Sequence, residues 1–106
     1  MLLRDKDREL IVSLAKETLK HPSSLWAYGS RVTGEAHDTS DLDLVIVSKD
    51  GQKIDIDEFI DFKEALQNSN IPILTQVFDW HRLPESFHKN ILVNYEEIFD
   101  IEEKRA

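Results

Sequence analysis

The hydrophobic and polar residues of this chain alternate with a helical period in two long stretches. In residues 4–20, apolar side chains recur every three or four positions with charged residues between them, so we expect an amphipathic helix. That helix should end where Pro22 follows, because the residue before a proline avoids the helical region. Residues 55–67 carry a second helical stripe, with Asp55 or Asp57 placed to cap its N-terminus.

Shorter apolar runs, rich in β-branched and aromatic residues and bounded by turn residues, predict strands. These runs occupy residues 25–28, 42–48, 71–80 and 95–101, and Pro72 is expected to delay the third strand. The run at 42–48 is almost continuously apolar, which is typical of a strand buried on both faces. A short helix is expected from about Arg31 to Gly34, and a longer one from Pro84. This order of elements predicts an α/β fold in which helices pack on a small mixed sheet.

The composition is that of an ordinary globular protein. Its 106 residues are the length of one domain, so we expect residues 1–106 to fold as a single unit. The chain has no cysteine, which excludes disulfides and thiolate metal sites and fits a reducing compartment, so we expect a cytoplasmic protein. We expect no membrane association, because the N-terminus lacks a signal-peptide pattern and no apolar run approaches the ~20 residues of a membrane helix. The net charge of −8 argues against direct nucleic-acid binding and suits either a basic partner or solubility alone.

Candidate chemistry is concentrated between the first two predicted strands. Gly29 and Ser30 follow the first strand and precede a short helix, a geometry that suits phosphate because backbone N–H groups point at the anion. Asp41 and Asp43 stand two positions apart at the mouth of the second strand, so their carboxylates share one face. Oxygen ligands of this kind hold Mg²⁺. A phosphate site beside a pair of metal-binding carboxylates favours nucleotide chemistry.

Each half of this pattern has an ordinary structural explanation. A glycine after a strand often serves only to reach a positive φ, and Ser40 with Asp41 is a common cap where a loop enters a strand. The occurrence of both motifs in this order, with ten residues between them, is much harder to explain by turns and caps alone. Asp43 also lies on the same face of the predicted strand as Val45 and Val47. A negative charge on an apolar strand face is costly unless another charge offsets it, and a metal ion provides that charge.

The segment GSRVTGEAHDTSDLDL resembles the minimal nucleotidyltransferases of the DNA polymerase β superfamily, and a leading helix and the Phe78-Asp79-Trp80 run extend the resemblance over the chain. The resemblance implies a polymerase-β-like nucleotidyltransferase fold and implies that Asp41 and Asp43 are catalytic residues that bind Mg²⁺. It also implies that Gly29 and Ser30 hold the phosphates of ATP. Arg31 and Ser40 are further candidates for binding the nucleotide.

The resemblance also implies a partner. Small proteins of this kind form hetero-oligomers with HEPN-domain proteins, in which the HEPN protein is an RNase toxin and the nucleotidyltransferase is its antitoxin. In some pairs the antitoxin transfers AMP from ATP to a tyrosine of the toxin. We therefore expect a Mg²⁺-dependent adenylyltransferase that neutralises a HEPN toxin.

The chain departs from the family pattern at one position. The family takes a third carboxylate from the next strand, and that position falls at Gln76, which has a carbonyl oxygen but no negative charge. Asp79 lies three residues further on, which is the opposite face of a strand, so we expect it to cap the strand end. Two alternatives therefore stay open: an antitoxin of the same fold that acts by binding alone, and a nucleotidyltransferase for a small molecule.

Overall fold

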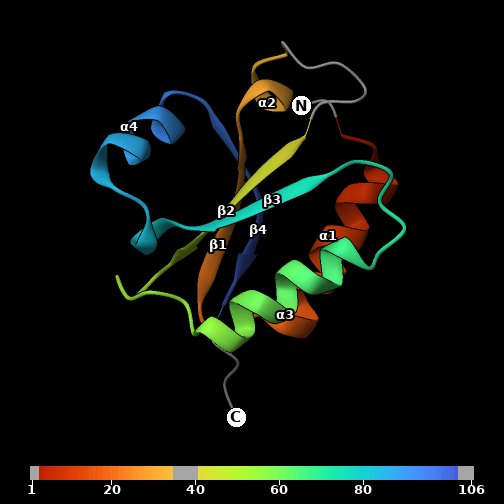
Figure 1. Ribbon diagram of the computed structural model, residues 1–106, viewed down its shortest axis with the longest axis horizontal. Coiled ribbons are helices and arrows are strands. Elements are labelled where there is room, and N and C mark those ends of the chain that lie inside the picture. The colour runs from red at the N-terminus through yellow and green to blue at the C-terminus, as the bar shows by residue number, and fades with distance from the viewer. Residues whose placement is uncertain (1–2, 35–40, 103–106) are drawn as a thin grey trace.

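The computed structural model describes residues 3–34 and 41–102, which form a four-stranded sheet with helices on both faces (Figure 1). The sheet has the order β3-β2-β1-β4. Its strands are β1 (Ser23–Tyr28), β2 (Leu42–Ser48), β3 (Thr75–Asp79) and β4 (Tyr95–Ile101). β1 is antiparallel to both β2 and β4, whereas β2 and β3 are parallel. This is the mixed sheet that the sequence predicts.

Two amphipathic helices, α1 (Asp5–Thr18) and α3 (Ile56–Gln67), cover one face of the sheet. Their apolar stripes bury Ile11 and Phe62 against the alternate positions of β1 and β2, of which Leu44 is an example. Asp55 caps α3 as expected, because its carboxylate accepts hydrogen bonds from the backbone N–H groups of residues 57 and 58. Among the described residues, no helix is both long and apolar enough to span a membrane.

The other face of the sheet is aromatic and is covered by α4 (Glu85–Val93) (Figure 1). Phe87 of α4 packs edge-on against Tyr28 of β1, with ring centroids 6.3 Å apart, and lies 6.1 Å from Phe78 of β3. Trp26 stacks on Tyr95 at 4.3 Å, so the large rings pack against the sheet and against one another. Val45 is fully buried on this face, and the prediction that the second strand is buried on both faces is confirmed.

The third strand is shorter than the sequence predicts. It begins at Thr75, because Pro72 has no N–H to donate to a sheet and the residues around it leave the strand conformation. It ends at Asp79, whose carboxylate accepts a hydrogen bond from the backbone N–H of His81 and starts the short 3₁₀ helix η1 (Trp80–Arg82). The prediction of a strand over 71–80 was therefore wrong at both ends, by four residues and by one.

Candidate nucleotide-binding site

The site is built at the end of the sheet where β1 stops and β2 begins. Gly29 follows β1 with φ of 86° and leads into α2 (Ser30–Thr33), whose backbone N–H groups at Val32 and Thr33 donate to the Gly29 carbonyl oxygen. A Cβ on Gly29 would lie 2.6 Å from Oδ2 of Asp43. Glycine is needed here for two reasons, because a side chain would be strained at this φ and would displace the Asp43 carboxylate.

Asp43 occupies the middle of this arrangement. It pairs with Tyr28 of β1 on one side and with Gln76 of β3 on the other. Burial raises the pKa of Asp43 above its ordinary value, and the nearby charge of Asp41 raises it further. The pKa of Tyr28 is raised to about 12, first by burial and then by the Asp43 charge. The two carboxylates thus leave a negative potential that a bound cation would relieve.

Gln76 completes the group. The parallel register sets it directly opposite Asp43, and its side-chain Nε2 donates a 2.9 Å hydrogen bond to Oδ2 of Asp41. This register places Gln76 beside Asp43, and the assignment of Gln76 to the third carboxylate position of the family stays a prediction. Its amide nitrogen, not its carbonyl oxygen, is turned toward Asp41.

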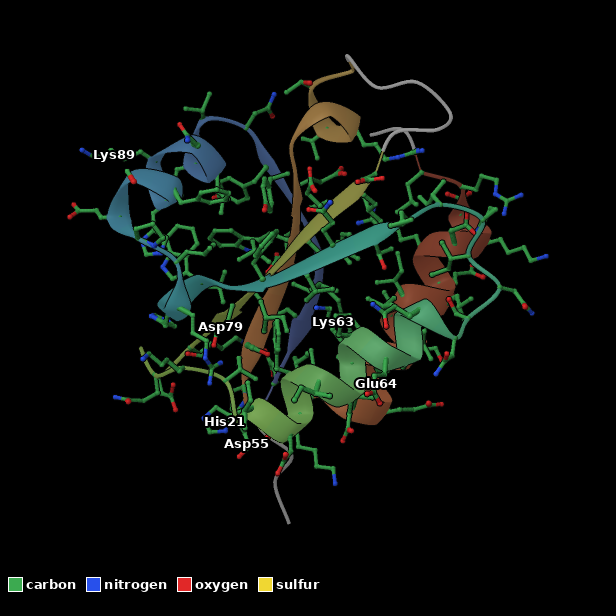
Figure 2. The ribbon with its side chains drawn as sticks, viewed as in Figure 1. His21, Asp55, Lys63, Glu64, Asp79 and Lys89 are labelled. Carbon is green, nitrogen blue, oxygen red and sulfur yellow. The ribbon has the colours of Figure 1, made fainter. Side chains whose placement is uncertain are left out.

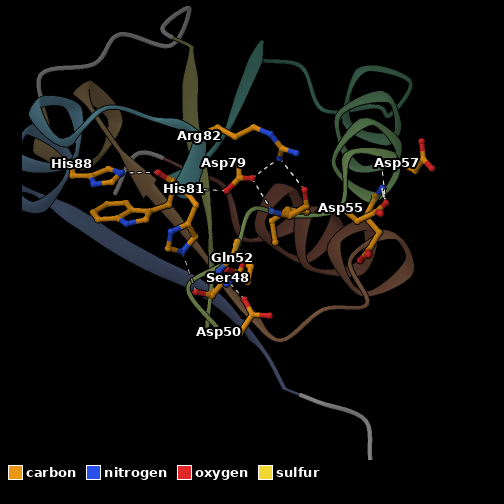
Figure 3. A network of polar contacts seen from close by, with 12 residues as sticks. Ser48, Asp50, Gln52, Asp55, Asp57, Asp79, His81, Arg82 and His88 are labelled. Atoms are coloured by element: carbon orange, nitrogen blue, oxygen red, sulfur yellow. Dashed lines mark hydrogen bonds and ion pairs between the residues drawn. The ribbon is translucent and has the colours of Figure 1, made fainter.

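Asp79 lies at the opposite end of the sheet, where it performs a structural function (Figures 2 and 3). Its Oδ2 accepts from the backbone N–H of Ile54 at 2.8 Å and from Nη1 of Arg82 at 2.5 Å, while Oδ1 accepts from the His81 N–H. The side chain is fully buried within these contacts. The expectation that Asp79 caps the strand end is confirmed, and its carboxylate is unavailable to the pair at the other end.

The family model for the polymerase β nucleotidyltransferases matches residues 9–104 of the chain. The chain belongs to this family. This chain is 37% identical over 87 residues to the probable protein adenylyltransferase MntA of Haemophilus influenzae. The alignment covers 81% of this chain and 75% of that protein. The predicted fold class and family are thereby confirmed.

Two solved structures share the fold. One is a crystal structure of a toxin–antitoxin with AMP-PNP, which matches with a TM-score of 0.72 at 14% identity and covers 88% of this chain and 73% of that chain. The other is a mutant of the toxin–antitoxin MntA-HpeT, with a TM-score of 0.70 at 12% identity, covering 87% of this chain and 72% of that chain. At these identities the likeness concerns the fold of the nucleotidyltransferase.

The nucleotidyltransferase offers two carboxylates to a divalent ion. The Asp43 carboxylate fills the space above Gly29 and lies two residues from Asp41 at the mouth of β2, so the pair offers the oxygen ligands that Mg²⁺ prefers. In residues 3–34 and 41–102, no group of three or more His, Cys, Asp or Glu side chains could hold a metal ion. Among the described residues, the charge available at this site is therefore that of two carboxylates beside one neutral amide.

The structure describes the other residues predicted to bind the nucleotide less completely. Ser40 lies outside the described residues, and of Ser30 only the backbone is described, at the start of α2. Arg31 is 4% exposed and therefore lies within the protein. Its charge contributes, after the Arg4 hydrogen bond, to lowering the pKa of Asp7. Arg31 as a ligand of phosphate remains a prediction.

Tyr28 lies at the site, although the sequence predicts for it only the end of the first strand. Its phenol packs under Phe87 and its backbone pairs with Asp43, so it forms one wall of the carboxylate group. The available signal was its position directly before Gly29, because an antiparallel hairpin between β1 and β2 brings that residue opposite Asp43.

Proposed function

We propose that this nucleotidyltransferase is an antitoxin that binds ATP with Mg²⁺ and neutralises a HEPN-domain RNase toxin in a hetero-oligomer. The observation that carries the proposal is the contact between the Gly29 turn and the Asp43 carboxylate, beside Asp41. It joins a sharp backbone turn, able to receive phosphates, to the ligands of the ion that accompanies them. The likeness to a probable protein adenylyltransferase supports a protein substrate.

The first mechanism is transfer of AMP to a hydroxyl of the toxin. The hydroxyl oxygen forms a bond to the α-phosphorus of ATP, the bond from that phosphorus to the β-phosphate oxygen breaks, pyrophosphate leaves, and the hydroxyl proton passes to a base. Mg²⁺, held by Asp41 and Asp43, supplies charge stabilisation to the phosphates when bound. The Gly29 turn orients the triphosphate, and Tyr28 and Phe87 keep one side of the carboxylate group dry.

A surface beside the site is suited to the partner. Leu92 and Val93 at the end of α4 and Tyr95 at the start of β4 are exposed by 51%, 84% and 41%. Tyr95 pairs with Tyr28, the residue before Gly29, so this apolar surface adjoins the nucleotide site. A toxin bound there would present a hydroxyl close to the phosphates, and the acidic chain would complement a basic partner.

The second mechanism is neutralisation by contact alone, and the Gln76 amide specifically favours it. An amide is not a base and carries no charge, so the position of a third carboxylate contributes neither proton transfer nor metal affinity. The surface formed by Leu92, Val93 and Tyr95 would act equally well in both mechanisms, because it requires no chemistry.

Co-expression with a HEPN-domain protein, the partner that the proposal names, tests the proposal. We expect the two to elute together from a size-exclusion column at micromolar concentration, and Val93→Asp to separate them by placing a charge in the apolar surface. Lys63→Asp is the control, because Lys63 is exposed on α3, which covers the other face of the sheet (Figure 2). Intact mass spectrometry of the partner then separates the mechanisms, since only transfer adds one AMP. Separate elution of the parent proteins contradicts an antitoxin function.

A further inference from the structure

We propose that Gln76 restricts this site to one divalent ion for each bound ATP, and that transfer of AMP by the natural chain is slow for that reason. The inference rests on the proposed function only in that ATP and a divalent ion bind at Asp41 and Asp43. It concerns the number of ions and the speed of chemistry, which the family and the fold leave open. Three features of the structure support it.

The first feature is the orientation of the Gln76 side chain. Its Nε2 donates to Oδ2 of Asp41, so this carboxylate oxygen already has a hydrogen-bond donor. Turning the amide would place its carbonyl oxygen against Asp41, bringing two acceptors together and losing the hydrogen bond. In this orientation Gln76 is a donor to Asp41, and it can offer a metal ion only one neutral carbonyl oxygen, at the expense of this hydrogen bond.

The second feature is charge. Two ions that act on one phosphoryl transfer lie about 3.5–4 Å apart, and their mutual repulsion must be offset by the ligands they share. Asp41 and Asp43 carry two negative charges at most, and Gln76 beside them adds none. Affinity for hard cations depends strongly on the charge of the ligands. One ion together with the triphosphate is what this group can hold.

The third feature is that nothing nearby in the described structure replaces the missing carboxylate. Asp79 is bound to Ile54, His81 and Arg82 at the far end of the sheet (Figure 3). Residues 3–34 and 41–102 hold no three-member group of metal-binding side chains. Gln76 cannot accept a proton from an attacking hydroxyl, so the missing ligand is also a missing base.

The test counts manganese ions on the full-length chain with a non-hydrolysable ATP analogue. Equilibrium dialysis gives manganese per bound nucleotide, and electron paramagnetic resonance distinguishes an isolated Mn²⁺ ion from a coupled pair. We expect one isolated ion in the parent and in Gln76→Leu, and a coupled pair in Gln76→Asp. Gln52→Asp is the control for an added charge, because Gln52 is exposed in the turn after β2, away from the site, and it should keep one ion.

A coupled pair of ions in the parent would overturn the inference and leave the proposed function intact. A single ion in Gln76→Asp, with the fold preserved by circular dichroism, would equally overturn it. Absence of nucleotide binding by the parent at any manganese concentration would overturn the proposed function itself. A second readout is AMP transfer to the co-purified partner, which we expect to increase about a hundredfold or more in Gln76→Asp, the contribution of a positioned base. Equal rates in the two proteins would contradict the part of the inference that concerns speed.

Discussion

Gly29→Ala is the substitution that tests the site geometry most directly. The residue has φ of 86°, where a side chain costs about 1–2 kcal/mol, and the new Cβ would lie 2.6 Å from Oδ2 of Asp43. That oxygen is at the end of a side chain that can rotate, so the additional strain is about 0.5–1.5 kcal/mol. The larger effect is on function, because the carboxylate must move away from the turn.

Gly51→Ala is a matched control. Gly51 also has a positive φ, 75°, but an added Cβ would meet nothing within 4 Å. Both variants should melt lower, by about 4–8 °C for each kcal/mol lost. Only Gly29→Ala should lose affinity for Mg·ATP, by about tenfold or more, corresponding to about 1.4 kcal/mol. Calorimetry with both variants measures this difference, and equal Mg·ATP affinities would refute the close contact between the turn and Asp43.

Three further predictions concern charges. Replacing Asp41 and Asp43 together by Asn should abolish the Mg²⁺-dependent part of ATP binding in calorimetry and raise the melting temperature in metal-free buffer, because two neighbouring negative charges are removed. Asp79→Asn should destabilise the fold by about 2–4 kcal/mol in urea unfolding and leave ATP affinity unchanged, because the buried carboxylate accepts three hydrogen bonds far from the site. The exposed ion pair of His21 and Asp50 raises the pKa of His21 above 6.5 and lowers the pKa of Asp50 to about 2. The small contribution of this pair to the stability of the fold should be lost as the pH rises through the raised pKa of His21, and also as the pH falls toward 2. His21→Gln should therefore lower the melting temperature most near pH 5 and hardly at all above pH 8, and a constant difference would contradict this pairing.

Much of the fold was predictable because local patterns decide it. The second strand and the strand over 95–101 have the predicted bounds, and Asp55 caps α3, since hydrophobic runs and capping residues act over a few positions. The start of the third strand was not predictable from its apolar residues. Ile71 and Ile73 pack against the core from outside the sheet, so burial there does not require a strand.

The candidate site was predictable in its residues and less so in its contacts. One end of the sheet brings together four residues, as the order of the strands and the alternation of side chains along them indicate: Gly29, Asp41, Asp43 and Gln76. The hydrogen bond between Gln76 and Asp41 depends on a parallel register and on the direction of an amide, and no sequence pattern encodes either. Tyr28 becomes part of the site only through the hairpin that brings it opposite Asp43.

If the exposed apolar surface on α4 and β4 binds the partner, its position explains why an amide can be tolerated at Gln76. Leu92, Val93 and Tyr95 come from the junction of α4 and β4, whereas the proposed metal and phosphate ligands come from the turn after β1 and from the start of β2. A change in one set leaves the other intact, so contact with a toxin can persist when transfer is slow. A third carboxylate would also repel Asp43 whenever metal is absent, and the hydrogen bond from Gln76 to Asp41 replaces that repulsion with an attraction. Where contact alone neutralises the toxin, this exchange stabilises the metal-free protein and costs the cell no protection.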